Sequence, residues 1–122
     1  MNKYQALHKF WNSFGWKAYD ENTVPDNAEL PYITYEAAAG SLGSELPLSA
    51  SLWQRSTSWN EISEKAIEIE RKIKENGHLT MRIDNGLLYI NAEPKFSQRM
   101  AGGVDNIRRI ILNIKAEFLT AY

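Results

Sequence analysis

The chain has 122 residues, of which 43% are hydrophobic and 24% are charged. This length and balance fit one ordinary domain with a buried core, and they exclude a chain that is disordered by composition. Cysteine is absent, which excludes disulfides, thiol chemistry and cysteine-ligated zinc. The formal net charge of −1 argues against attraction of the whole surface to nucleic acid or to an anionic membrane, and it leaves room for a local basic patch.

The sequence shows no targeting or membrane-spanning pattern. Residues 1–16 are interrupted by polar residues throughout and lack the unbroken apolar region of a signal peptide. No stretch approaches the roughly 18 consecutive apolar residues of a membrane-spanning helix. We therefore expect a protein that is made and folds in a cytoplasm and has no membrane partner.

The first element that we expect is a short helix ending at Gly15. Tyr4, Leu7, Trp11 and Phe14 fall on one face of a repeat of 3.6 residues per turn. Glycine suits the left-handed conformation that follows many helices. The pattern predicts an amphipathic helix whose aromatic face packs in the core, and an exposed aromatic docking surface is the alternative.

Two strands are expected after a polar loop. Residues 20–31 are rich in Asp, Asn and Pro, which is the chemistry of turns. Residues 32–38 begin with β-branched and aromatic side chains, and residues 46–55 alternate between two faces. The second strand should therefore have one buried face. Leu46, Leu48, Ala50 and Leu52 would share that face, and Ser49, Ser51 and Trp53 the opposite one.

The clearest helix is expected over residues 58–76. Ser58 and Glu61 have the spacing of a capping box, in which each side chain bonds the backbone of the other. Asn76 and Gly77 would end the helix. One helix laid on a sheet explains every residue of this segment. Its buried face would consist of Ile62, Ala66, Ile69 and Ile73.

A hairpin and a loop should follow. Residues 78–83 and 87–91 flank Asn85 and Gly86, the strongest short-range signal for a tight hairpin turn. Residues 92–103 then have the composition of a long connection, and connections of that length are usually functional or mobile. We expect a loop here that is mobile in the free protein.

The segment near the C-terminus alternates as a strand. In residues 107–119 the polar side chains of the second half fall on one parity, whereas a helix would scatter them around its axis. The predicted strand is longer than the usual five or six residues. Ile111 and Leu119 share the polar parity. A sheet that is covered on one face only would leave them exposed to water, and contact with another subunit would cover them.

These elements give the order α-β-β-α-β-β-β. The simplest packing is an α+β fold in which two helices cover one face of a mostly antiparallel sheet. No internal repeat or domain boundary is visible, so we expect a single domain over residues 1–122.

The sequence contains no convincing catalytic, cofactor-binding or metal-binding site. His8 and His78 are the only histidines, and neither stands in a metal-ligand spacing. Arg108 and Arg109 form a small basic pair. Its plain interpretation is charge at a strand edge that discourages aggregation, and its functional interpretation is contact with nucleic acid or with an acidic neighbour. We therefore expect no enzyme and assign no cofactor.

Four stretches of the chain resemble the small tail-terminator and tail-completion proteins of long-tailed bacteriophages and prophages. Residues 24–36 (VPDNAELPYITYE) resemble the start and first strand of that family. Residues 48–62 (LSASLWQRSTSWNEI) resemble its second strand and the start of the following helix. Residues 83–91 (IDNGLLYIN) resemble its hairpin, and residues 108–120 (RRIILNIKAEFLT) its closing strand.

The resemblance implies an architectural role in the virion. Such proteins form a ring, typically a hexamer, on the head-proximal end of the tail tube, where the ring stops tube polymerisation and meets the head connector. The implied partners are further copies of the chain, the tail tube protein, the head-connector protein, and DNA that passes through the lumen without sequence-specific binding. Assembly would occur in the host cytoplasm. Our candidate ring or docking contacts are Lys95, Phe96, Gln98, Arg99, Met100, Arg108, Arg109, Ile111 and Leu119.

Other functions stay open. Another head–tail connector or minor capsid component would have a similar size and topology. An enzyme or a small-molecule-binding or regulatory domain would show converging groups in a deep pocket. A nucleic-acid module would show a continuous basic face around Lys95, Arg99, Arg108 and Arg109.

Overall fold

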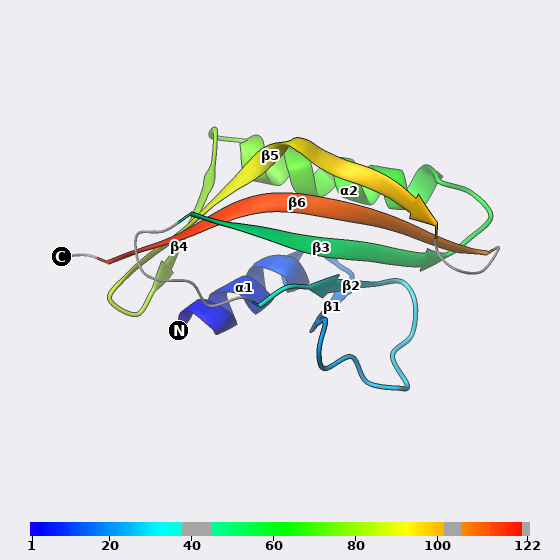
Figure 1. Cartoon of the computed structure of the whole chain (residues 1–122), viewed down its shortest axis with the longest axis horizontal. Helices are drawn as coiled ribbons and strands as arrows, with labels where there is room; N and C mark the ends of the chain where they lie inside the picture. The colour runs from blue at the N-terminus through cyan, green and yellow to red at the C-terminus, as the bar shows by residue number, and fades with distance from the viewer. Residues whose placement is uncertain (38–44, 102–105, 121–122) are drawn as a thin grey trace.

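Six strands form one sheet in the order β1-β2-β3-β6-β5-β4 in the computed structural model, which describes residues 1–37, 45–101 and 106–120 (Figure 1). β1 and β2 are parallel, and every other neighbouring pair is antiparallel. The expected α+β class is confirmed. The strands are β1 (Lys17–Asp20), β2 (Tyr32–Tyr35), β3 (Glu45–Arg55), β4 (Leu79–Ile83), β5 (Gly86–Ala101) and β6 (Ile107–Thr120).

Both helices pack on the same face of the sheet, as predicted. α2 (Asn60–Lys74) lies against β3, β4, β5 and β6, while α1 (Lys3–Trp11), continued by the 3₁₀ turn η1 (Asn12–Phe14), contacts the edge strands β1 and β4. The sheet curls, so that both of its edges reach the same helix (Figure 1). The amino group of Met1 lies 2.7 Å from a carboxylate oxygen of Asp84, which ties the N-terminus to the β4–β5 hairpin.

The core lies between the helices and alternate residues of the long strands. In β6 the side chains Ile110, Leu112, Ile114 and Phe118 are at most 3% exposed, which confirms the strand expected near the C-terminus. Burying one such side chain stabilises a fold by about 1.5–3 kcal/mol. The buried face of α2 is also as predicted: Ile62, Ala66, Ile69 and Ile73.

Two turns form as their residues indicate. Gly15 follows η1 with φ 85°, and Asn85 turns the β4–β5 hairpin with φ 63°, both in the left-handed region. The hairpin register places Met81 opposite Leu88, so the apolar faces of the two strands meet.

The loop predicted over residues 92–103 is wrong. β5 continues to Ala101 and pairs with β6 again after an irregularity between Ala92 and Ser97. The irregularity shifts the register between the two strands, and polar residues surround it, so the alternation of the strand is hidden in the sequence. The last two residues of the predicted loop lie outside the described part of the chain.

The start of α2 also differs from the prediction. The helix begins at Asn60, because Trp59 occupies the N-cap position and makes no side-chain capping bond. The Oγ of Ser58 accepts a hydrogen bond from the N–H of Asn60 at 3.1 Å, in a turn that precedes the helix. Glu61 closes no capping box, since its carboxylate accepts a hydrogen bond from Gln54 instead.

Three smaller features were mispredicted near the N-terminus. β1 was missed, because four residues are too few for a visible alternation and its pairing with β2 arises only in three dimensions. β2 ends at Tyr35, before the expected end at residue 38. In α1 the side chain of Tyr4 is 46% exposed, and Ala6 joins the buried face in its place.

Candidate interaction surface

The sheet face opposite the helices is open in the described part of the chain, because both helices pack on the other face. Figure 1 shows α2 behind β5. Side chains on alternate residues of β3, β5 and β6 point to this open face. Register partners place a row of basic, aromatic and apolar residues across five strands at one end of it. The row, from β1 to β5, is Lys17, Tyr32, Trp53, Arg109 and Met100.

Arg109 is held in a fixed position in this row. Its guanidinium carbon lies 4.6 Å from the ring centroid of Trp53, and its Nε donates a hydrogen bond of 3.2 Å to the Oγ of Ser51. The indole N–H of Trp53 in turn donates to the Oγ1 of Thr34 at 3.0 Å. A guanidinium that stacks on an indole keeps its outer N–H groups available.

Two further arginines surround Trp59 at the same end of the sheet. The guanidinium carbons of Arg99 and Arg108 lie 4.8 Å and 5.2 Å from the Trp59 ring centroid. Arg108 also donates from Nη2 to the carbonyl of Thr57 at 2.9 Å. Both arginines stand on the helix-covered parity of their strands, whereas Arg109 stands on the open parity. Arg55 stands at the end of β3, opposite Ile107, and donates a hydrogen bond of 3.3 Å to Oδ1 of Asn106. We call the following set the arginine–tryptophan end: Arg55, Arg99, Arg108, Arg109, Trp53 and Trp59.

An acidic loop joins β1 to β2 at the edge of the sheet (Figure 1). Residues 20–29, which we call the acidic loop, contain Asp20, Glu21, Asp26 and Glu29 and no lysine or arginine. The last three side chains are exposed. Asp20 stabilises the start of the loop, because its side chain accepts a hydrogen bond from the N–H of Asn22 at 2.9 Å.

These two charged regions form no ion pair in the described residues. The four ion pairs found there join Met1 to Asp84 and three lysines of α2 to glutamates of that helix or, for Lys72, to its C-cap residue Glu75. Neither the arginines of the arginine–tryptophan end nor the carboxylates of the acidic loop take part. One basic region and one acidic region therefore stand uncompensated on a chain whose net charge is only −1.

The structure separates the candidate contacts that we expected from the sequence. Gln98, Met100, Arg109 and Ile111 lie together on the open face of β5 and β6. Arg99 and Arg108 lie at the same end of the sheet but on its helix-covered face, around Trp59. Lys95 is exposed at the irregularity of β5, and Leu119 pairs with Leu87 at the opposite end of β6. Phe96 is only 3% exposed and packs in the core, so we remove it from the candidate contacts.

Sequence reasoning missed the tryptophans and the acidic loop as parts of this surface. The sequence places Trp53 correctly on the outer face of its strand. Its pairing with Arg109 depends on how β3 and β6 align, and the two residues are 56 positions apart (109 minus 53). The acids of residues 20–29 were read only as turn residues. Four carboxylates within ten residues, with no lysine or arginine among them, were the available signal.

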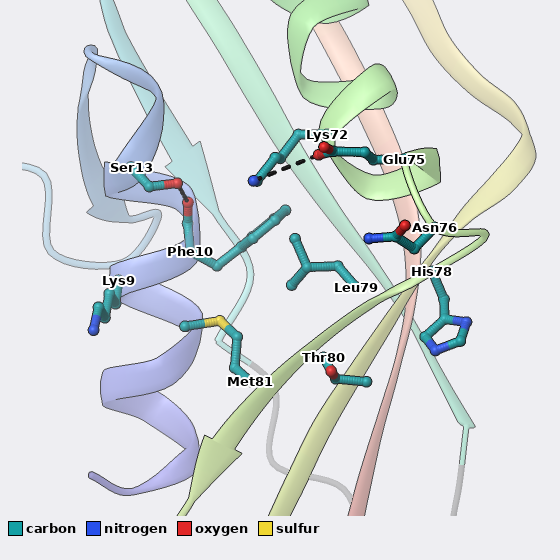
Figure 2. Close-up of a pocket in the computed structure, with 10 residues that line it drawn as sticks. All are labelled: Lys9, Phe10, Ser13, Lys72, Glu75, Asn76, His78, Leu79, Thr80 and Met81. Atoms are coloured by element: carbon teal, nitrogen blue, oxygen red, sulfur yellow. Dashed lines mark hydrogen bonds and ion pairs between the residues drawn. The ribbon is translucent and has the colours of Figure 1, made fainter.

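A depression of about 410 Å³ lies between α1, the end of α2 and β4 (Figure 2). Phe10, Leu79 and Met81 are its apolar residues. Its polar groups do not converge: Lys72 pairs with Glu75 at 3.6 Å, and the ring of His78 points away from the other labelled side chains (Figure 2). Because no acid, base and nucleophile meet here, we assign no chemistry to the depression.

The two histidines and the buried Tyr35 have structural partners. Nδ1 of His8 lies 2.9 Å from the hydroxyl of Tyr35, and the His78 ring stacks on Tyr89 with centroids 4.2 Å apart. Burial raises the pKa of the Tyr35 hydroxyl, and the charge of Asp20 raises it further. Among the described residues no group of three or more His, Asp or Glu side chains is arranged to hold a metal ion.

Comparison of the chain with known protein families gives no match, and comparison with curated proteins gives none either. No helix in the described residues has the length and apolar character needed to cross a membrane.

Proposed function

We propose that this chain is a structural, non-enzymatic subunit of a long-tailed bacteriophage or prophage virion, in which copies form a ring that caps the head-proximal end of the tail tube. The resemblance of four sequence stretches to tail-terminator and tail-completion proteins supports this proposal. Those stretches contribute β2, β3, the β4–β5 turn and β6, which together form most of the sheet.

The observation that carries the proposal is the open face of three long strands. β3, β5 and β6 have 11, 16 and 14 residues, whereas an average strand has five or six. Ile111 and Leu119 point to this face and are half-buried within one copy. A subunit contact would remove their apolar surface from water, at about 25 cal/mol per Å² buried.

In this proposal the ring ends tube growth and gives the head connector a surface to bind. The partners are other copies of the chain, the tail tube protein and the head-connector protein, and DNA passes through the lumen without being read. The particle location is the head-proximal end of the tail, after assembly in the bacterial cytoplasm. Heterologous contacts between identical subunits close into such a ring when their rotation permits.

A gene deletion in the phage background tests the proposal, with the wild-type gene supplied from a plasmid as the control. Electron microscopy should then show tails of irregular, excessive length, or finished tails that have not joined heads. Normal particles at normal titre would contradict the proposal. Full heads that lose their DNA beside tails of normal length would point instead to another head–tail connector.

A nucleic-acid module is the second candidate, and the arginine–tryptophan end is the observation that favours it. Four arginines gather there with two tryptophans, and basic groups interleaved with aromatic rings fit a phosphate backbone and its bases. This candidate competes with a protein partner for the same arginines, and the experiment below separates the two.

A further inference from the structure

We infer that the arginine–tryptophan end of one copy binds the acidic loop of a second copy. This inference rests on the proposed function for its setting in a ring, and it adds the two surfaces that meet. The contact would be head-to-tail, because it joins two different regions of the same chain.

Charge complementarity is the first reason. The acidic loop carries four carboxylates and only Lys17 beside it, and none of the four forms an ion pair; the four arginines of the arginine–tryptophan end have no carboxylate partner among the described residues either. A like-charged neighbour would cost several kcal/mol at either surface, so each selects the other. A nucleic acid would satisfy only the arginines and would leave the acidic loop uncompensated and repelled.

Separation within one copy is the second reason. The acidic loop is attached to β1 and β2, and neighbouring strands lie about 4.8 Å apart, so β6 is about 10 Å and β5 about 14 Å across the sheet from β2, the nearer of the two. Arg99 on β5 and Arg108 on β6 therefore lie far from the loop that leaves β1. Within one copy, most charges of the acidic loop cannot reach the arginines. A second copy can bring the two regions into contact.

Pre-organisation is the third reason. Arg108 and Arg109 are held by hydrogen bonds to Thr57 and Ser51 and by the tryptophan rings, so little side-chain entropy remains to be lost on binding. The outer N–H groups of a fixed, planar guanidinium match the two oxygens of a carboxylate. The loop is also anchored, through the Asp20–Asn22 turn.

The test is a charge exchange between exposed residues. One variant carries Arg55→Glu and Arg99→Glu, and the other carries Asp26→Arg and Glu29→Arg; all four side chains are exposed, so both variants should fold. Lys9→Glu with Arg71→Glu is the matched control, because these exposed cations lie on α1 and α2, outside both regions and away from the open sheet face. Self-association is measured by sedimentation velocity at low salt over a concentration series.

Each variant alone should associate more than about tenfold more weakly than the wild type, and the control should associate like the wild type. An equimolar mixture of the two variants should recover association, because every contact then joins opposite charges. Loss of association in the control as well, or no recovery in the mixture, would overturn the inference. The recovery also shows that both variants are folded.

Three further outcomes separate this inference from its alternatives. If Arg55→Glu with Arg99→Glu removes binding to labelled duplex or single-stranded DNA and leaves self-association unchanged, the arginines serve nucleic acid and the inference fails. If the charge exchange behaves as expected but the gene deletion leaves normal particles, the contact stands and the tail-terminator proposal fails. If the wild type itself stays monomeric at every concentration, the inference is wrong.

Discussion

The guanidinium of Arg109 lies over the indole of Trp53, its register partner across β3 and β6, with 4.6 Å between the guanidinium carbon and the ring centroid. The stacking holds the Arg109 guanidinium in a fixed position on the open sheet face. A lysine at the same position would keep the charge and lose the planar stacking and the bond to Ser51.

We therefore predict that Arg109→Lys lowers the free energy of unfolding by about 1 kcal/mol. A cation–π contact at an exposed site contributes about 0.5–1 kcal/mol, and a typical hydrogen bond about 0.5–1.5 kcal/mol. Urea denaturation followed by tryptophan fluorescence measures the change. Lys115→Arg, at an exposed position of the same strand, is the control and should leave stability unchanged. An Arg109→Lys midpoint equal to that of the wild type would show that the stacking has no energetic role.

The buried face of α2 should dominate the stability of the domain. Ile69 is fully buried and Ile67, two residues earlier on the same helix, is 51% exposed. Ile69→Ala should cost about 2–5 kcal/mol, because it leaves a cavity under the sheet. Ile67→Ala should change stability by less than about 0.5 kcal/mol. Equal losses for the two variants in chemical denaturation would mean that the helix face is assigned wrongly.

The second half of β5 should behave as a strand. Residues 97–101 pair with β6, so alternate amides in this segment should exchange slowly with solvent in hydrogen-exchange measurements. Phe96→Ala should cost about 3–5 kcal/mol, since the ring is 3% exposed. Uniformly fast exchange across residues 97–101, together with only a small loss of stability in Phe96→Ala, would support a loop here instead of a strand.

Tyr35 should make the protein sensitive to alkali. Burial first, and the charge of Asp20 second, raise the pKa of its hydroxyl above the ordinary value of about 10. A group with a raised folded-state pKa contributes stability that is fully present below the unfolded pKa and is lost as the pH rises through the folded pKa. Stability should therefore fall as the pH rises above about 10.

The Tyr35→Phe variant isolates this effect, because phenylalanine keeps the ring and cannot ionise. Its unfolding midpoint in urea should decline less between neutral pH and about pH 11 than that of the wild type. The lysines and the other tyrosines titrate in both proteins, so the difference between the two curves reports Tyr35. Parallel curves would mean that the Tyr35 hydroxyl ionises without cost to the fold.

The sequence predicted those parts of the molecule that depend on local pattern. The alternation of β6, the Ile face of α2 and the Asn85 turn each follow from residues within one element. The course of β5 did not, because Pro94 and the register shift between Ala92 and Ser97 interrupt its alternation.

The candidate surface was harder to predict, because its pairs are distant in sequence. Arg108 and Arg109 were noted as a basic pair, but adjacent residues of a strand point to opposite faces. One therefore meets Trp59 and the other Trp53. Such contacts depend on the register between β3 and β6 and on the position of α2, and no periodicity within either segment encodes them.

Disulfide trapping tests the ring itself, and the absence of native cysteine makes it specific. A protein carrying Arg99→Cys and Asp26→Cys, two exposed positions, is oxidised at high concentration, and the products are weighed by native mass spectrometry. Arg71→Cys with Asp26→Cys is the control and should give few crosslinks, because Arg71 is exposed on α2, away from the open sheet face. We predict a ladder of products that ends at a closed hexamer with one intersubunit disulfide per copy. A product that stops at a dimer with two disulfides would show a two-fold contact and contradict the ring, and crosslinking no greater than in the control would contradict the contact as well.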